Sequence, residues 1–191
     1  MRVIAGTARS LRLLTPKGLH TRPTPDRIKE TLFNMLIPYV PNALVLDLFA
    51  GSGGLGIEAL SRGARYAFFV DNNESACKCI TQNLHTTKLE EKGELIKRDA
   101  LAGMEYLATL KELEDKSIDL VFIDPPYEKG YEKKVLDLLA QQKYISNETL
   151  IILESGSNMN PNSLTNEALH IEKVKLYKTN MHLFIRRRIT E

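Results

Sequence analysis

Residues 122–130 read FIDPPYEKG, in which an apolar run ends in an aspartate, two prolines and a tyrosine. Asp124 and the carbonyl group of Pro125 offer two hydrogen-bond acceptors, and the rings of Pro125 and Pro126 hold this backbone rigid. Two such acceptors could bind the N–H groups of an amino group on a nucleobase and free its lone pair for attack. Tyr127 offers a face on which an extruded base can stack. These four residues are the candidate catalytic residues, although a turn after a buried strand is the plain structural alternative.

A glycine-rich turn lies earlier, in ALVLDLFAGSGGLG. Gly51, Gly53 and Gly56 fit the dinucleotide fingerprint G-x-G-x-x-G, and Asp71 follows about twenty residues later, so an NAD-dependent oxidoreductase is one hypothesis. Asp47 argues against it, because a carboxylate before the turn would repel a pyrophosphate. The same carboxylate would attract the ammonium group of S-adenosylmethionine, which carries no phosphate. We therefore favour S-adenosylmethionine as the cofactor, while a tight turn without a ligand remains the structural alternative.

The remaining parts of that cofactor suggest further partners along the chain. Asp71 could accept both ribose hydroxyl groups, and Asp99 could accept the adenine amino group. Phe49 would form an apolar wall. The candidate cofactor-binding residues from this pattern are Asp47, Phe49, Gly51, Gly53, Asp71, Asn72, Asp99 and Ala100.

Alternating apolar strands and amphipathic helices must position these residues. The pattern from residue 43 to residue 154 predicts an α/β fold with a mostly parallel sheet and helices on both faces. Two alternating segments around Thr179 and Asn180 predict a C-terminal antiparallel hairpin at one edge of the sheet. Ligands of such sheets bind beyond the carboxyl ends of the strands. Acids stand at five predicted strand ends, namely Asp47, Asp71, Asp99, Asp124 and Glu154.

The beginning of the chain has a different texture. Residues 2–6 and 11–14 predict two short strands joined by a turn. Thr24 and Pro25 predict the start of a helix over residues 26–36, with a capping hydroxyl group followed by proline at the first helical position.

Composition and charge narrow the class of protein. The chain has 191 residues, 43% of them hydrophobic, and a net charge of only +2, which suits one globular domain with a small extension. Residues 1–25 carry basic residues and no acidic one, which suggests a polyanionic partner. Cys77 and Cys79 predict reduced thiols rather than a disulfide or zinc site. With no signal-like or membrane-spanning run, we expect a cytoplasmic protein that binds no metal.

Several stretches together resemble one family. They are MRVIAG, LLTPKGLHTRPTPDRIKETLFNML, LDLFAGSGGLGIEALSRGA and DLVFIDPPY. The chain resembles the RsmD family of bacterial 16S ribosomal RNA guanine-N2 methyltransferases over nearly its whole length. The segment TRPTPDRIKETLFN is the most specific part, because general methyltransferase motifs do not include it. Two positions depart from the family pattern, since Ser10 stands where glycine is expected and Asp71 where glutamate is usual.

The resemblance implies a fold, an activity and further site residues. It implies a Rossmann-like methyltransferase domain over residues 21–191 and a β-hairpin RNA-binding extension over residues 1–20. Its substrate would be a guanine of 16S ribosomal RNA in an assembled or assembling small subunit. Thr24 would then line the approach to the cofactor. The nucleic-acid-binding candidates are Arg2, Arg9, Arg12, Lys17 and Arg22, which would contact phosphates without reading the sequence.

Two further functions stay open at this point. An adenine-N6 methyltransferase acting on nucleic acid shares the DPPY motif, although this chain leaves no room for a DNA target-recognition domain. A ribosome-assembly module that has lost catalysis would keep the fold without the reaction. We expect a monomer that prefers a protein-bound ribosomal particle to free RNA.

Overall fold

The computed structural model describes residues 1–16, 25–126, 130–164 and 166–188. The helices of this part are α1 (Asp26–Met35), α2 (Gly54–Ser61), α3 (Glu74–Thr87), α4 (Ala100–Leu107) and α5 (Tyr131–Leu139). Short 3-10 helices lie at Glu90–Lys92, Lys111–Leu113 and Pro161–Leu164. The strands are β1 (Leu44–Leu48), β2 (Tyr66–Val70), β3 (Gly93–Ile96), β4 (Leu120–Ile123), β5 (Leu150–Gly156), β6 (Leu169–Leu176) and β7 (Asn180–Arg187).

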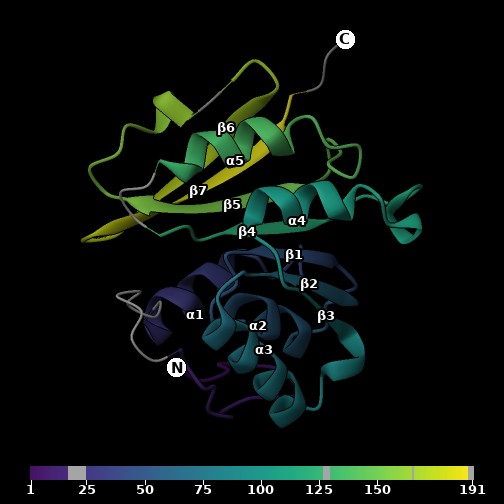
Figure 1. Cartoon of the computed structure of the whole chain (residues 1–191). Helices are drawn as coiled ribbons and strands as arrows, with labels where there is room; N and C mark the ends of the chain where they lie inside the picture. The colour runs from purple at the N-terminus through teal and green to yellow at the C-terminus, as the bar shows by residue number, and fades with distance from the viewer. Residues whose placement is uncertain (17–24, 127–129, 165, 189–191) are drawn as a thin grey trace.

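The described strands form one seven-stranded sheet in the order β3-β2-β1-β4-β5-β7-β6. Strands β1 to β5 are parallel, whereas β7 pairs antiparallel with both β5 and β6. Helices α1, α2 and α3 lie below the sheet in Figure 1, and α4 and α5 lie above it. The predicted α/β fold with a C-terminal antiparallel hairpin is therefore confirmed. None of the described helices has the length and apolarity needed to cross a membrane.

The core lies in two layers because successive strand residues point to opposite faces. Leu46, Leu48 and Ile123 belong to the cluster packed against α4 and α5. Val45 and Phe122 belong to the other cluster, where the Phe122 ring centroid lies 5.7 Å from that of Phe33 in α1. Burial on both faces explains why β1 and β4 read as continuous apolar runs.

The first 14 residues pack against the underside of α1 and α2. Val3, Ala8 and Leu13 are buried in the same core cluster as these helices. The two predicted strands are reduced to one antiparallel bridge between Arg2 and Arg12. Val3 still exchanges backbone hydrogen bonds with Leu11 and Ser10, whereas the N–H groups of Ile4 and Ala5 donate to the Glu58 carboxylate.

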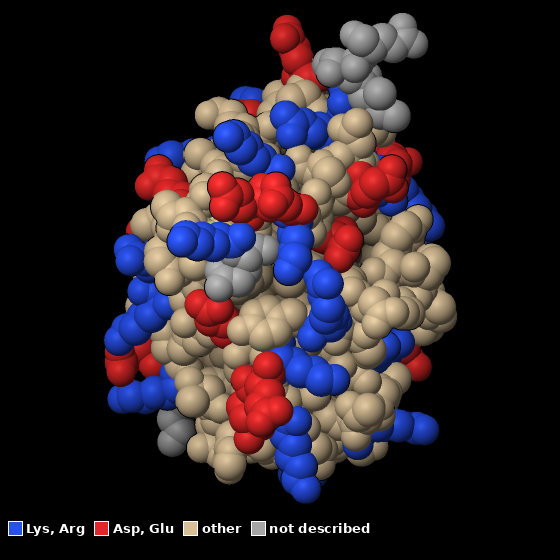
Figure 2. All heavy atoms as spheres, turned by 90° about the vertical axis from the view of Figure 1, so that its right-hand side faces the viewer, with Lys and Arg blue, Asp and Glu red and all other residues tan. Residues whose placement is uncertain are grey.

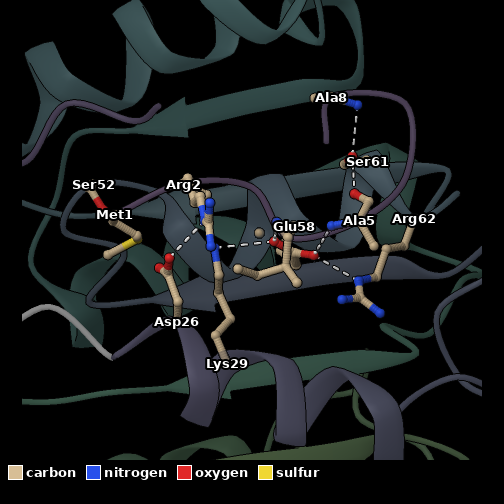
Figure 3. A network of polar contacts seen from close by, with 12 residues as sticks. Met1, Arg2, Ala5, Ala8, Asp26, Lys29, Ser52, Glu58, Ser61 and Arg62 are labelled. Carbon is tan, nitrogen blue, oxygen red and sulfur yellow. Dashed lines mark hydrogen bonds and ion pairs between the residues drawn. The ribbon is translucent and has the colours of Figure 1, made fainter. Parts of the chain in front are cut away.

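Glu58 in α2 is the centre of this attachment (Figure 3). Its side chain is fully buried, and its oxygens lie 3.1 Å from Lys29 Nζ and 2.7 Å from Arg62 Nε. Lys29 Nζ also donates to the carbonyl oxygen of Arg2 at 2.6 Å. One buried carboxylate thus connects α1, α2 and the N-terminal segment.

Ser10 carries measurable backbone strain, because its φ angle of 70° lies in the left-handed region. We expect Ser10→Gly to raise the free energy of unfolding by up to about 1 kcal/mol, since glycine adopts this conformation without a steric penalty. Chemical denaturation of the purified variant would measure the change. Ser10→Ala is the control and should leave stability within about 0.5 kcal/mol of wild type, because it keeps a Cβ at the same φ. A Ser10→Gly variant less stable than Ser10→Ala would contradict this account.

The start of α1 differs from the sequence prediction. Pro25 is the N-cap residue, with φ −56° and ψ 142°, and the helix begins at Asp26. Pro25 therefore lies one position earlier than expected, because its extended ψ angle cannot belong to a helical turn. Thr24, the predicted cap, lies outside the described residues.

The C-terminal arginines have structural partners. Arg186 Nε lies 3.0 Å from Glu172 Oε1, and its Nη1 donates to the carbonyl oxygen of Glu148. Arg187 Nη1 donates to the carbonyl oxygen of Ile145 at 2.8 Å. These contacts fasten β7 to the loop before β5 and explain two of the three consecutive arginines.

Candidate functional site

Three carboxylates gather where parallel strands end. Asp47 is opposite Phe122 in the β1–β4 register, and Asp124 follows Ile123 at the end of β4. Glu154 follows Leu153, the β5 partner of Ile123. All three belong to the same alternating set as the residues that pack toward α1 and α2. The structure therefore brings together acids that are 30 or more positions apart in the sequence.

Asp47 is almost completely buried, with 2% of its surface exposed. Its Oδ2 accepts the N–H of Gly56 at 2.9 Å, which ties β1 to the first turn of α2. Burial raises the pKa of Asp47 to about 8; the Gly56 hydrogen bond opposes this shift, and the Asp71 charge adds to it. A neighbouring cation would reverse the shift, so the site favours a positively charged group.

We expect Asp47→Asn to remove a pH dependence from the stability of the protein. In the wild type the unfolded Asp47 ionises near its ordinary pKa of 3.8, while the folded one keeps its proton up to about pH 8. The folded state thus binds more protons in this window, so the free energy of unfolding falls as pH rises, by an amount on the order of a few kcal/mol. Denaturant titrations should give the variant the same free energy of unfolding as wild type at about pH 4. Near pH 8 the variant should have the higher free energy of unfolding.

The exposed residue Asp115 supplies the control for this measurement. Asp115→Asn removes one carboxylate as well, yet should leave the pH dependence of wild type intact. If the free energy of unfolding changed with pH in the same way in Asp47→Asn and in wild type, burial would not raise the pKa of Asp47 as proposed.

The glycine turn is held to the next strand by Asp71. Asp71 Oδ2 accepts the N–H of Gly51 at 2.8 Å, and its Oδ1 accepts the N–H of Asn73 at 2.9 Å. Gly51 and Gly53 have φ angles of 57° and 75°, which glycine adopts without strain. Phe49 is a non-glycine residue in the same region, with φ 61°, and its ring lies 5.6 Å from that of Tyr131. Strain of this kind is often found at functional sites.

Asp99, which the sequence predicts to bind the adenine of the cofactor, has a structural role. Asp99 is the N-cap residue of α4, and its Oδ1 accepts the N–H groups of Leu101 and Ala102 at 3.1 and 3.2 Å. Asp99 is exposed, whereas Ala100 is buried at the start of the helix. Asn72 is exposed directly after Asp71. Capping accounts for Asp99, and a cofactor role for Asp99, Ala100 and Asn72 stays a prediction.

Asp124 and the prolines leave the sheet at the end of β4. Asp124 and Pro126 are half-buried and Pro125 is buried. Burial, followed by the charges of Glu154 and Asp47, raises the pKa of Asp124 well above its usual value. Tyr127 lies outside the described residues, so its stacking role also stays a prediction.

The basic candidates of the N-terminal segment are on the surface. Arg2, Arg9 and Arg12 are exposed, and Arg2 Nε lies 2.9 Å from Asp26 Oδ2. Lys17 and Arg22 lie outside the described residues. Figure 2 shows the right-hand side of Figure 1, opposite the carboxyl ends of the parallel strands, where Lys and Arg are interspersed with Asp and Glu. Among the described residues, this face therefore carries both signs of charge.

The whole architecture matches a known family. The family model described as "Conserved hypothetical protein 95" matches residues 1–185. The chain belongs to this family. Members include proteins named "Ribosomal RNA small subunit methyltransferase D". The one from Escherichia coli (strain K12) is 35% identical over 175 residues, which is 91% of this chain and 84% of the relative. The one from Haemophilus influenzae is 38% identical over 159 residues, covering 81% of this chain and 78% of the relative.

The fold of this family is known from experiment as well. The solved structure of the Escherichia coli protein yhhF aligns with 100% of this chain and 99% of its own, with a TM-score of 0.81 and 30% identity. The resemblance to the RsmD family drawn from the sequence is thereby confirmed.

Sequence reasoning missed the partners of two buried carboxylates, Glu154 and Glu58. Glu154 was recognised as a strand-end acid, but its partners Asn180 and His182 on β7 were not. The buried Glu58 between Lys29 and Arg62 was also missed. An (i, i+4) spacing of Glu58 and Arg62 was visible, yet on a helix this pattern usually marks a solvated face.

Proposed function

We propose that this chain is an S-adenosylmethionine-dependent methyltransferase of small-subunit ribosomal RNA, and that the acceptor is the N2 amino group of a guanine in 16S ribosomal RNA. The observation that carries the chemistry is the convergence of Asp47, Asp124 and Glu154 beside a glycine turn. The names of its relatives support the choice of substrate. The choice of N2 rests on the resemblance noted in the sequence.

The residues present fit the cofactor. Asp47 is a buried carboxylate with a raised pKa, which an ammonium group would complement. In the proposed site Asp47, Gly51 and Gly53 hold the amino-acid part, Asp71 and Asn72 the ribose, and Phe49, Asp99 and Ala100 the adenine, with Thr24 at the entrance. When bound, S-adenosylmethionine supplies an electrophilic methyl group. Asp47 would release its proton as the cation binds, which calorimetry of S-adenosylhomocysteine in buffers of different ionisation enthalpy detects.

The Asp-Pro-Pro-Tyr segment would orient the acceptor. Asp124 and the carbonyl group of Pro125 accept hydrogen bonds from the two N–H groups of the base, and Pro126 fixes the direction of the backbone. Tyr127 stacks on the base. Catalysis in this proposal comes from positioning and electrostatics, without a covalent link to the protein.

The N-terminal segment would hold the RNA. We assign residues 1–20 to an RNA-binding extension and residues 21–191 to the catalytic domain. Arg2, Arg9, Arg12, Lys17 and Arg22 would contact phosphates, which position an RNA without reading its sequence. Few contacts of this kind cannot select one loop, so the proposed substrate is a small subunit or its assembly intermediate. The enzyme would work as a monomer, in the cytoplasm where subunits are assembled.

One assay tests this function. Purified protein is incubated with methyl-labelled S-adenosylmethionine and small ribosomal subunits from cells that lack the endogenous enzyme, and the RNA is then digested to nucleosides. We expect label in N2-methylguanosine, and more of it from particles than from free RNA. Label in N6-methyladenosine would overturn the acceptor. No label, with S-adenosylhomocysteine still bound, would favour a non-catalytic assembly module.

A further inference from the structure

A row of polar side chains crosses the sheet next to Asp124. Asp124 and Glu154 directly follow Ile123 and Leu153, which are partners in the parallel β4–β5 pair. Glu154 is in turn the cross-strand partner of His182 in the antiparallel β5–β7 pair. Because side chains alternate along strands, Asp124, Glu154 and His182 point to the same face of the sheet. The row therefore runs from the candidate catalytic residue to the C-terminal hairpin.

Glu154 is held firmly within this row. Its Oε1 accepts a hydrogen bond from Nδ2 of Asn180 at 2.7 Å, and its Oε2 lies 3.1 Å from Nε2 of His182. Asn180 and His182 are 5% and 2% exposed, so these bonds are shielded from water. On its other side, Nδ1 of His182 lies 3.3 Å from the hydroxyl group of Tyr177. A buried side chain with such contacts cannot turn away from its place.

The partners of His182 keep its ring in one orientation. Burial and the charge of Glu154 raise the pKa of Tyr177, whose hydroxyl oxygen lies 3.3 Å from Nδ1 of His182. Nε2 of His182 faces the carboxylate of Glu154. Both Glu154 oxygens accept hydrogen bonds, as in an ionised carboxylate. The edge-on packing of the Tyr177 and His182 rings, with centroids 5.1 Å apart, keeps this arrangement in place.

An ionised Glu154 makes its neighbour Asp124 more basic. Burial raises the pKa of Asp124 most, and the charge of Glu154 contributes more than that of Asp47. Among the described residues, the titratable groups facing this pair are Asp47 from β1, His182 from β7 and Tyr177 from the turn before β7. Asp47 adds to the negative charge around Asp124.

We propose that Asp124 is the proton acceptor of the reaction and that Glu154, held next to it by His182 and Asn180, is the positioning residue that prepares Asp124 for this role. The inference rests on the proposed function. An amino group that has gained a methyl group carries one proton too many. That N–H bond breaks, its electron pair stays on nitrogen, and the proton moves to a carboxylate oxygen of Asp124. Asp124 later returns the proton to water, once the product has left.

The first test needs no substrate. The side-chain carboxyl carbon of Asp124 is followed by ¹³C NMR against pH in the ligand-free protein, and its signal is assigned with Asp124→Asn. In Glu154→Gln we expect the titration midpoint of Asp124 to fall by about one pH unit or more, because a neighbouring negative charge is lost. Glu154→Asp keeps the charge and should retain most of the wild-type midpoint. An unchanged midpoint in Glu154→Gln would overturn the proposal.

The second test uses the reaction. We expect the acid limb of the kcat–pH profile in Glu154→Gln to move to lower pH by the same amount as the NMR midpoint. On the alkaline plateau kcat should fall by up to about tenfold for each pH unit of the midpoint shift, because Asp124 has become a weaker base. KM for the ribosomal particle should stay close to wild type.

A matched control separates this role from a purely structural one. Glu148→Gln removes an exposed carboxylate just before β5 and should leave the midpoint, the profile and kcat unchanged. A Glu154→Gln variant could lose thermal stability and activity together while the acid limb of its kcat–pH profile stays where it is in wild type. That result would assign Glu154 a purely structural role. If wild-type protein transferred no methyl group at any pH, the proposed function would fail, while the NMR midpoint would still decide whether Glu154 tunes Asp124.

Discussion

Replacing Asp124 by alanine is expected to lower methyl transfer by roughly 10²–10⁴-fold while S-adenosylhomocysteine binds with nearly wild-type affinity. Asp124 lies at the end of β4, beyond the sheet core, and its carboxylate is the group proposed to accept hydrogen bonds from the acceptor nitrogen. Alanine removes that acceptor and leaves the glycine turn of β1 and α2 untouched. Single-turnover transfer to small subunits, combined with calorimetric binding of S-adenosylhomocysteine, measures both quantities.

Two further variants sharpen this result. Asp124→Asn keeps the shape and one acceptor oxygen but lacks the negative charge, so its loss should approach that of alanine if charge is the essential property. Asp71→Ala should show the opposite order, with cofactor affinity reduced first, because Asp71 contacts Gly51 in the turn. If Asp124→Ala weakened cofactor binding as much as Asp71→Ala does, Asp124 would belong to the cofactor site instead.

Replacing Glu58 by alanine should lower the free energy of unfolding by about 3–5 kcal/mol. The variant leaves the ammonium group of Lys29 buried without its carboxylate and the N–H groups of Ile4 and Ala5 without their acceptor. Burial lowers the pKa of Lys29, the charge of Arg62 adds a smaller part, and the charge and hydrogen bond of Glu58 oppose the shift. Thermal denaturation should show a decrease in Tm of roughly 6–20 °C, given about 2–4 °C per kcal/mol in a domain of this size.

A double-mutant cycle provides the control. Lys29→Met in the Glu58→Ala background removes the unpaired buried charge, so the double variant should recover part of the lost stability. Exposed Glu74, which pairs with Lys78 at 3.5 Å on α3, supplies the surface comparison. Glu74→Ala should change stability far less than Glu58→Ala, because water screens an exposed ion pair. A similar cost for Glu58→Ala would show that the buried network does not fasten the N-terminal segment.

Residue patterns predicted the architecture, which the structure confirms, and they pointed to candidate site residues at the strand ends. Continuous apolar runs such as residues 44–48 and 120–123 predicted buried parallel strands, because a strand covered by helices on both faces has no polar side. Parallel strands end at one edge of a sheet, so the sequence pattern already predicts that Asp47, Asp71 and Asp124 lie near one another. Local chemistry was also readable, since the positive φ angles at Gly51 and Gly53 occur where the glycine pattern required them.

The pairing of polar groups across the chain depends on tertiary packing. Glu58 received no role from the sequence, and it is buried because separate segments bring a lysine, an arginine and two backbone N–H groups to it. Likewise, β7 inserts between β5 and β6, and this strand order places His182 against Glu154. Sequence periodicity reports which face of an element is buried, whereas the partner of a buried charge depends on how distant elements pack. Strand and helix patterns are local in origin, and these ion pairs and hydrogen bonds exist only once the sheet has formed.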